Sequence, residues 1–188
     1  GYQKDGMIGA KDIDLVQTEK SQIIQKSGLL EMVQLREAMQ DIGGLEKLKP
    51  WLEQKSQIFA DWPAARDFGV ESPKGVMIVG MPGCGKSLTA KATAKLFGLP
   101  LLKMDIGSLM GKYVGESEGN MRRAIAVAEA VSPCVLWVDE VEKAFAGIGS
   151  GAAGSEVATR LFGYFLTWMQ EKTAQVFVVT TANDISVL

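Results

Sequence analysis

Histidine does not occur in this 188-residue sequence, and its absence narrows the chemistry that the chain can perform. A chain without histidine has no imidazole general base, no Ser-His-Asp triad and no histidine ligand for a metal. Proton transfer must therefore depend on carboxylates, on water or on a metal ion. Cysteine is scarce as well. Cys84 and Cys134 do not make a disulfide framework, so a reduced, cytosol-like compartment is the default expectation.

The sequence also lacks long apolar runs and an excess of positive charge. No apolar run approaches the roughly 18 residues of a membrane span, and residues 1–14 do not have the layout of a signal peptide, so no membrane partner is expected. The formal net charge is −2 and the isoelectric point is near 5.3. Because broad nucleic-acid binding needs a basic face, nucleic acid is not an expected partner, although a local basic groove is not excluded.

The apolar pattern alternates between strands and helices from residue 75 onward. Within the strands, apolar residues follow one another without polar residues between them, which is typical of strands buried on both faces. Strand–helix repetition of this kind predicts an α/β fold, with a parallel sheet covered by helices on both faces. The predicted strands are 75–80, 100–105, 134–140 and 174–183, and the predicted helices are 86–98, 116–131 and 155–172.

The first 40 residues are polar and only weakly periodic. We interpret residues 1–40 as a linker, or the end of an upstream N-terminal region, with a short helix broken near Gly28 and then an extended piece. An independent binding segment is the alternative. Residues 45–59 have leucine and phenylalanine near helical spacing, and Pro50 should kink or restart that helix.

Residues 80–87, GMPGCGKS, fit the phosphate-loop pattern G-x-x-x-x-G-K-[ST] and lie between a predicted strand and a predicted helix. Glycines let such a loop curl so that backbone N–H groups face phosphate oxygens, and the following helix adds the positive end of its dipole. Lys86 would reach the β- and γ-phosphates of ATP, and the Ser87 hydroxyl would bind Mg²⁺. The alternative is a glycine-rich turn with a chance lysine. The residues expected to bind the nucleotide here are Pro82, Gly83, Cys84, Gly85, Lys86, Ser87 and Leu88.

Two further strands are predicted to end in polar residues beside this loop. CVLWVDE ends in Asp139 and Glu140, and a parallel sheet places such groups at its carboxyl edge. Asp139 would hold Mg²⁺ through its water shell, and Glu140 would polarise the attacking water, as the natural candidate in a chain without histidine. VVTTAN ends in Asn183, whose amide could bond both the γ-phosphate and the water. Glu140, Lys86 and Asn183 form the predicted catalytic set; the alternatives are a solvated acidic turn and an ordinary turn asparagine.

These three motifs, in this order, resemble those of the AAA+ ATPases. Three longer stretches resemble the AAA branch: DIGGLEKLK is similar to the segment that lines the adenine pocket, ESPKGVMIVGMPGCGKSLTAKA to the entry of the phosphate loop, and KYVGESEGNMRRA to the pore-loop region of hexameric members. The resemblance covers about residues 40–188 and implies that Ile42 and Gly43 lie against the base. SGLLEMV, GCGKSL, SPCVLWVDEVEKAF and LTWMQEK are similar to the AAA family of cyanobacteria and plastids known as a hypothetical chloroplast reading frame.

The resemblance also implies a role for an aromatic residue on a glycine-flanked loop. In AAA hexamers the matching loop projects into a central channel, where Lys112, Tyr113 and Val114 would grip an extended polypeptide. The implied partners are further copies of the same chain, as a homo-hexamer of the full-length protein, and a protein substrate or adaptor that the sequence does not name. Tyr113 could instead pack on the neighbouring helix, and residues 146–156 could be a second pore loop or a connector.

Residues 41–188 are therefore interpreted as an incomplete AAA+ nucleotide-binding subdomain with ATP and Mg²⁺ as cofactors. The family's next strand, its arginine fingers and its helical lid are expected beyond residue 188, so we expect an apolar edge at 76–80 and little activity from these residues alone. The expected function is ATP hydrolysis that drives remodelling or threading of a protein in a ring. The alternatives are an ATP-dependent switch without translocation and a nucleic-acid-directed AAA+ protein. The expected compartment is the cytoplasm, or the plastid stroma if the gene is organelle-encoded.

Overall fold

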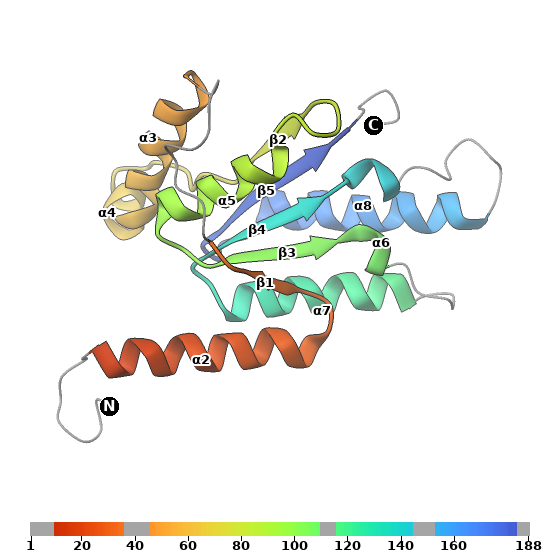
Figure 1. The fold of residues 1–188 in the computed structure, drawn as a ribbon, viewed down its shortest axis with the longest axis horizontal. Helices are drawn as coiled ribbons and strands as arrows, with labels where there is room; N and C mark the ends of the chain where they lie inside the picture. The colour runs from red at the N-terminus through yellow and green to blue at the C-terminus, as the bar shows by residue number, and fades with distance from the viewer. Residues whose placement is uncertain (1–9, 36–45, 110–115, 145–152, 184–188) are drawn as a thin grey trace.

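The described part of the chain folds around one sheet of five strands (Figure 1). The structure is a computed structural model and describes residues 10–35, 46–109, 116–144 and 153–183. The strands are β1 (Glu31–Val33), β2 (Gly75–Val79), β3 (Leu101–Asp105), β4 (Cys134–Asp139) and β5 (Val176–Ala182). They lie in the order β1-β3-β4-β5-β2; β3, β4, β5 and β2 are parallel, and β1 is antiparallel to β3. The carboxyl ends of the four parallel strands therefore meet at one edge.

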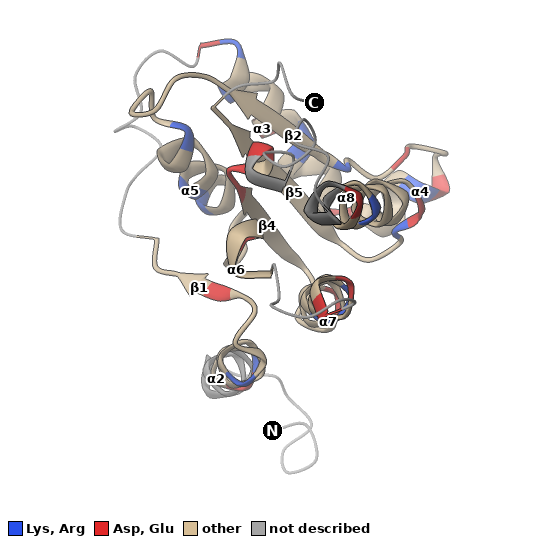
Figure 2. Ribbon diagram, turned by 90° about the vertical axis from the view of Figure 1, so that its right-hand side faces the viewer, with Lys and Arg blue, Asp and Glu red and all other residues tan. Residues whose placement is uncertain are grey.

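Helices cover both faces of this sheet, as Figures 1 and 2 show from two directions. On one face lie α3 (Leu48–Ala60) and α5 (Lys86–Phe97), and on the other lie α7 (Glu116–Ala130) and α8 (Ala153–Glu171). α2 (Ala10–Ser27) packs beside α7 and β1. Shorter elements join these layers: α4 (Trp62–Asp67), α6 (Ile106–Leu109) and η2, a 3₁₀ turn (Val141–Ala144). The predicted α/β fold with helices on both faces is confirmed.

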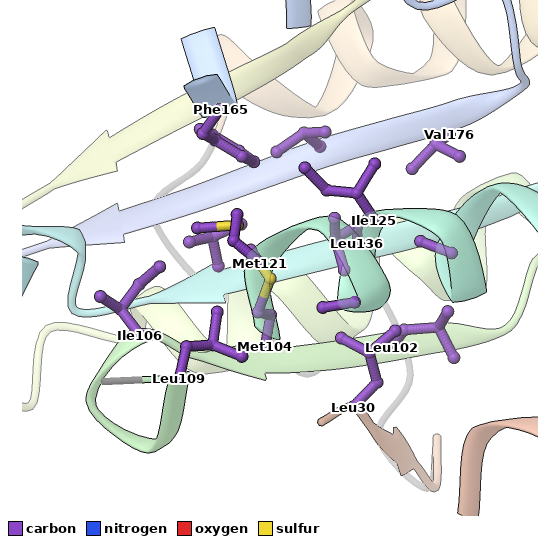
Figure 3. Close-up of a cluster of buried hydrophobic side chains, with 14 of the residues drawn as sticks. Leu30, Leu102, Met104, Ile106, Leu109, Met121, Ile125, Leu136, Phe165 and Val176 are labelled. Carbon is purple, nitrogen blue, oxygen red and sulfur yellow. The ribbon is translucent and has the colours of Figure 1, made fainter. Parts of the chain in front are cut away.

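The apolar face toward α7 and α8 forms the larger core cluster (Figure 3). Leu102 and Met104 of β3 point into it together with Leu136 of β4, and they meet Met121 and Ile125 of α7. All five side chains are at most 3% exposed. Removing one such side chain from water stabilises the fold by roughly 1.5–3 kcal/mol. This cluster therefore holds β3 and β4 in place, and with them the carboxyl ends of the two strands.

The opposite face is held by aromatic rings. Phe59 of α3, Phe97 of α5 and Phe177 of β5 pack with ring centroids 4.6–6.2 Å apart. Aromatic rings in edge-to-face or tilted contact stabilise the fold by more than the burial of their apolar area alone would. These ring contacts fix α5 against the sheet. α5 begins directly after the loop of residues 80–85, the glycine loop.

The sequence predictions match the elements closely, with three differences. Residues 10–27 form an 18-residue helix rather than a short one; it ends beside Gly28, whose φ is 64°. The extended piece after it is β1, which adds an antiparallel strand to a sheet predicted to be parallel. α3 begins two residues before Pro50, because a proline in the first helical turn lacks only an N–H that has no partner within the helix. The division of the chain at residue 40 stays a prediction.

β2 is an edge strand of the described sheet, as the family resemblance implies for residues 76–80. Two side chains of β2 are partly open to solvent: Met77 is 47% exposed and Val79 is 44% exposed. Its inner side requires close approach, since a Cβ on Gly75 would lie 2.2 Å from the Val178 carbonyl oxygen. A larger residue at position 75 would therefore disturb the pairing of β2 with β5.

Candidate functional site

The glycine loop between β2 and α5 begins at the carboxyl edge of the sheet. Gly83 and Gly85 have φ values of 82° and 90°, in the left-handed region where a side chain would be strained. Gly85 immediately precedes α5 and no side chain caps the helix. The amide groups of the first helical turn therefore face the loop, in the arrangement by which helix N-termini bind anions.

The other predicted nucleotide-binding residues lie on this loop and on the first turn of α5. Pro82, Cys84 and Ser87 are exposed, and Leu88 is half-buried. Lys86 folds back across the loop, where its ammonium group donates hydrogen bonds to the carbonyl oxygens of Gly80 and Met81, the latter at 2.9 Å. These two bonds use two of the three donors of the ammonium group, so one N–H of Lys86 is left to contact a phosphate.

Asp139 ends β4 at the same edge, and both of its carboxylate oxygens have partners from neighbouring strands. The Thr181 hydroxyl of β5 donates to Oδ1 at 2.8 Å, and the Lys103 ammonium of β3 lies 2.9 Å from Oδ2. The indole N–H of Trp137 donates to the same Thr181 hydroxyl at 3.1 Å. Asp139 is thus held in one orientation by a network that spans three strands.

Glu140 and Asn183 follow β4 and β5 directly and lie at this edge as well. Glu140 has a φ of 50°, a left-handed conformation that costs a non-glycine residue roughly 1–3 kcal/mol. The chain turns there into η2, which contains Glu142. Asn183 donates its side-chain N–H to Oε1 of Glu142 at 2.6 Å, while Oε2 of Glu142 is buried without a hydrogen-bond partner. The predicted set of Lys86, Glu140 and Asn183 therefore shares one edge, with Asn183 bonded to a carboxylate.

Two groups of predicted residues lie outside the described part of the chain. These are the adenine-pocket residues Ile42 and Gly43 and the pore-loop residues Lys112, Tyr113 and Val114. Their roles stay predictions.

Three residues at this edge were not singled out from the sequence. Lys103 had a signal, because a lysine between Leu102 and Met104 is unusual in a strand that is buried on both faces. Thr181 and Glu142 had none, since a threonine in a strand and a glutamate after an acidic pair are ordinary. Their partners lie more than 40 residues away along the chain, at Trp137 and Asn183 respectively.

The residues at this edge fit a magnesium ion. Mg²⁺ prefers hard oxygen ligands and keeps several of its waters. The Ser87 hydroxyl is exposed, and the two oxygens of Asp139 together offer about four acceptor positions, of which Thr181 and Lys103 use two. Asp139 can therefore still accept a hydrogen bond from a metal-bound water. Among the described residues, no group of three or more carboxylate, histidine or cysteine side chains could hold a metal ion.

The opposite, amino edge of the sheet contains two buried groups with shifted pKa values. Burial in the core raises the pKa of the Cys134 thiol to about 12. Burial also lowers the pKa of Lys172 from 10.5 to about 8, and the positive charge of Lys74 adds to this shift. Lys172 is 5% exposed and donates to the carbonyl oxygen of Val176 at the start of β5. These groups lie at the far end of the strands from the glycine loop.

A strand of a parallel sheet that leads through a G-x-x-x-x-G-K-S loop into a helix is characteristic of the P-loop nucleoside triphosphatases. Residues 76–188 match the family described as "ATPase family associated with various cellular activities (AAA)", and the chain belongs to this family. The resemblance stated from the sequence is thereby confirmed.

Individual relatives agree with this assignment. The chain is 47% identical over 181 residues to the AAA domain-containing protein ycf46 of Pyropia yezoensis, covering 96% of this chain and 36% of that protein. The ycf46 protein of Guillardia theta is 45% identical over 181 residues, covering 96% and 35%. The human ATPase family gene 2 protein homolog A is 37% identical over 150 residues, covering 76% and 16%. The chain spans about a third of the length of the ycf46 relatives it matches.

Among the helices that the structure describes, none combines the length and the apolar character that crossing a bilayer would require.

Proposed function

We propose that this chain is the nucleotide-binding subdomain of an AAA ATPase that binds Mg·ATP and hydrolyses it. One observation supports this most directly: the glycine loop before α5 and the acidic pair 139–140 lie at the same edge of the sheet, where the parallel strands have their carboxyl ends. In α/β sheets of this kind, ligands bind outside the carboxyl ends of the strands.

Each residue of the site has a role in this proposal. The amides of the loop and of the first turn of α5 bind phosphate oxygens, and Lys86 donates to phosphate from its ammonium group. Ser87 and Asp139 hold the magnesium ion, which when bound offsets the negative charge on the phosphates. Glu140 orients a water molecule and accepts its proton through a carboxylate oxygen. Asn183 hydrogen-bonds that water and the γ-phosphate through its side-chain oxygen and the N–H that Glu142 does not accept.

For the whole protein, we propose that hydrolysis moves the loop around Tyr113 in a ring of identical chains and so remodels or threads a protein substrate. The support is the family, together with the motif at residues 112–124 that resembles a pore loop. The proposed compartment is the cytoplasm, or the plastid stroma for an organelle-encoded protein.

The test compares two variants of the full-length protein. Glu140→Gln should keep its nucleotide affinity within about threefold, while phosphate release falls by roughly 10²–10⁴-fold, because the base is lost and the binding loop is not. Lys86→Ala should lose detectable ATP binding. Equilibrium binding of a fluorescent ATP analogue and a steady-state phosphate assay measure the two effects.

Lys95→Ala is the matched control, since Lys95 is exposed in the last turn of α5, at the other end of the helix from the loop. It should bind and hydrolyse ATP as the unmodified protein does. Normal phosphate release by Glu140→Gln would reject the assigned base, and normal ATP binding by Lys86→Ala would reject the site.

A further inference from the structure

Lys103 is a lysine in the middle of a strand that is otherwise apolar at its core positions. In β3, Leu102 and Met104 point toward α7 and α8, so Lys103 points to the other face, where it lies beside Trp137 in the register of β3 and β4. Its side chain is 30% exposed, because it extends along the sheet toward the carboxyl edge. A charged residue at such a position needs specific partners.

Two partners hold the ammonium group of Lys103. It lies 2.9 Å from Oδ2 of Asp139 and 4.7 Å from the centroid of the Trp137 ring. A cation above an indole ring is attracted by the negative face of the ring, and a charge-assisted bond to a carboxylate is stronger than a neutral one. Together they place a positive charge directly against the carboxylate that is proposed to hold Mg²⁺.

This positive charge changes what Asp139 offers to a second cation. Thr181 accepts a hydrogen bond from Trp137 and donates one to Oδ1, so the carboxylate cannot rotate freely away from Lys103. With its charge offset by Lys103, Asp139 attracts a hydrated divalent ion less strongly, and the ion and the ammonium group repel each other.

We propose, on the basis of the proposed function, that Lys103 is a positioning residue whose ammonium group offsets the negative charge of Asp139. Mg²⁺ then engages Asp139 against the positive charge of Lys103, which weakens the attraction between the ion and the carboxylate. Lys103 thereby raises the Mg²⁺ concentration at which the site binds a magnesium–nucleotide complex.

The test uses the full-length protein and a fluorescent ADP analogue, whose equilibrium binding is measured against free Mg²⁺ and in EDTA. Lys103→Met keeps the apolar stem over Trp137 and removes the charge. It should lower the half-saturating Mg²⁺ concentration by about two- to fivefold, the range expected from a partly exposed ion pair, and change binding in EDTA less. Lys103→Arg, which keeps the charge, should stay close to the unmodified protein.

Two comparisons separate this role from a merely structural one. Lys55→Met removes a lysine that lies over another ring, 5.6 Å from the centroid of Trp51 on α3, and should leave the Mg²⁺ dependence unchanged. In an Asp139→Asn background, Lys103→Met should lose most of its effect, because the partner of the ammonium group no longer carries charge. If Lys103→Met does not fold, Lys103→Gln is measured in its place.

An unchanged or raised half-saturating Mg²⁺ concentration in the Lys103 variant would overturn the proposal and leave the proposed function standing. An equal effect in the Asp139→Asn background would also overturn it, since the charge of Lys103 would then act without Asp139. Failure of the unmodified protein to bind the analogue at any Mg²⁺ concentration would reject the proposed function, and the role of Lys103 with it.

Discussion

The two edges of the sheet use lysine in different ways. At the carboxyl edge, Lys86 bonds to carbonyl oxygens of its own loop and Lys103 pairs with Asp139, and both side chains are partly open to solvent. At the amino edge, Lys172 is 5% exposed and bonds to the Val176 carbonyl oxygen. Lys74 donates to the carbonyl oxygens of Gln170 and Lys172 at 3.1 and 3.0 Å, at the C-terminal end of α8.

This difference shows how one residue type serves either binding or stability. Partners at the carboxyl edge can be exchanged for a ligand that arrives from solvent, because the ammonium groups there can be reached. Lys172 at the amino edge is closed off, so its interactions affect the free energy of unfolding and its pKa instead. Variants that remove one contact at a time can break or sharpen this comparison.

The largest expected effect on stability is the pH dependence that Lys172 confers. Its pKa is lowered to about 8 in the folded chain and is about 10.5 when unfolded, so between these values the unfolded chain binds the extra proton. The free energy of unfolding therefore rises with pH across this window, by at most about 3 kcal/mol for a shift of this size. Lys172→Met removes the rise, and urea unfolding of both proteins from pH 7 to 10 measures the difference.

Cys134 is a second group that titrates in this range, with the opposite sign. Its pKa of about 12 in the folded chain means that the unfolded thiol loses its proton first, which lowers stability above about pH 9. Because Cys134 is present in both proteins, its contribution largely cancels in the comparison. Lys95→Met controls for the loss of one lysine from an exposed position. Parallel stability curves for the unmodified protein and Lys172→Met would show that the charge of Lys172 is not sensed by the fold.

A smaller effect is expected from Thr181→Val, which keeps the shape of the side chain and removes its hydroxyl. The indole N–H of Trp137 then loses its acceptor in a position where Trp137 is 4% exposed and Thr181 is fully buried. An unsatisfied buried donor costs about 1–3 kcal/mol, and the same change frees Oδ1 of Asp139. Thermal unfolding and the Mg²⁺ dependence of nucleotide binding should therefore both change.

Thr180→Val is the matched control for this change. Thr180 precedes Thr181 on β5 and faces the other side of the sheet, so it is outside the network of Asp139. It should leave the Mg²⁺ dependence as it is. If Thr181→Val unfolds at the same temperature as the unmodified protein, the network across β4 and β5 does not stabilise the fold.

The smallest effect is expected from Lys74→Met, which removes two hydrogen bonds to carbonyl oxygens at the end of α8. A cation near a helix C-terminus contributes about 0.3–1 kcal/mol, so the free energy of unfolding should fall by that amount. The pKa of Lys172 should move upward, because the nearby positive charge is gone. The pH window of the Lys172 effect would then begin higher, which stability curves of Lys74→Met should show. Lys74→Arg retains the charge and should leave the window in place.

Particular residues show how far the sequence could predict this protein. The glycine loop was predictable because its spacing is local: eight consecutive residues contain the glycines, Lys86 and Ser87. The strands and most helices were predictable for the same reason, since apolar periodicity reflects burial. The antiparallel pairing of β1 with β3 was not, because pairing between segments about 70 residues apart leaves no local pattern.

The site follows the same division. Asp139, Glu140 and Asn183 could be expected at one edge because they end strands that were predicted to be parallel. The contacts of these residues could not, since Lys103 with Asp139 and Glu142 with Asn183 are meetings of side chains from different elements. Lys103 was visible only as an anomaly within an apolar strand.

By itself, the sequence determined the class of the fold, the phosphate loop and the family, because these depend on short-range spacing and on the apolar character of successive segments. Only the tertiary structure decided which charges meet. The pairing of β3 with β4 brings the ammonium group of Lys103 into contact with Asp139. The turn after β4 brings Glu142 within hydrogen-bond distance of Asn183. Electrostatic interactions act through space over a few ångströms, and distance in space between these residues is set by how the strands pair and not by their separation along the chain.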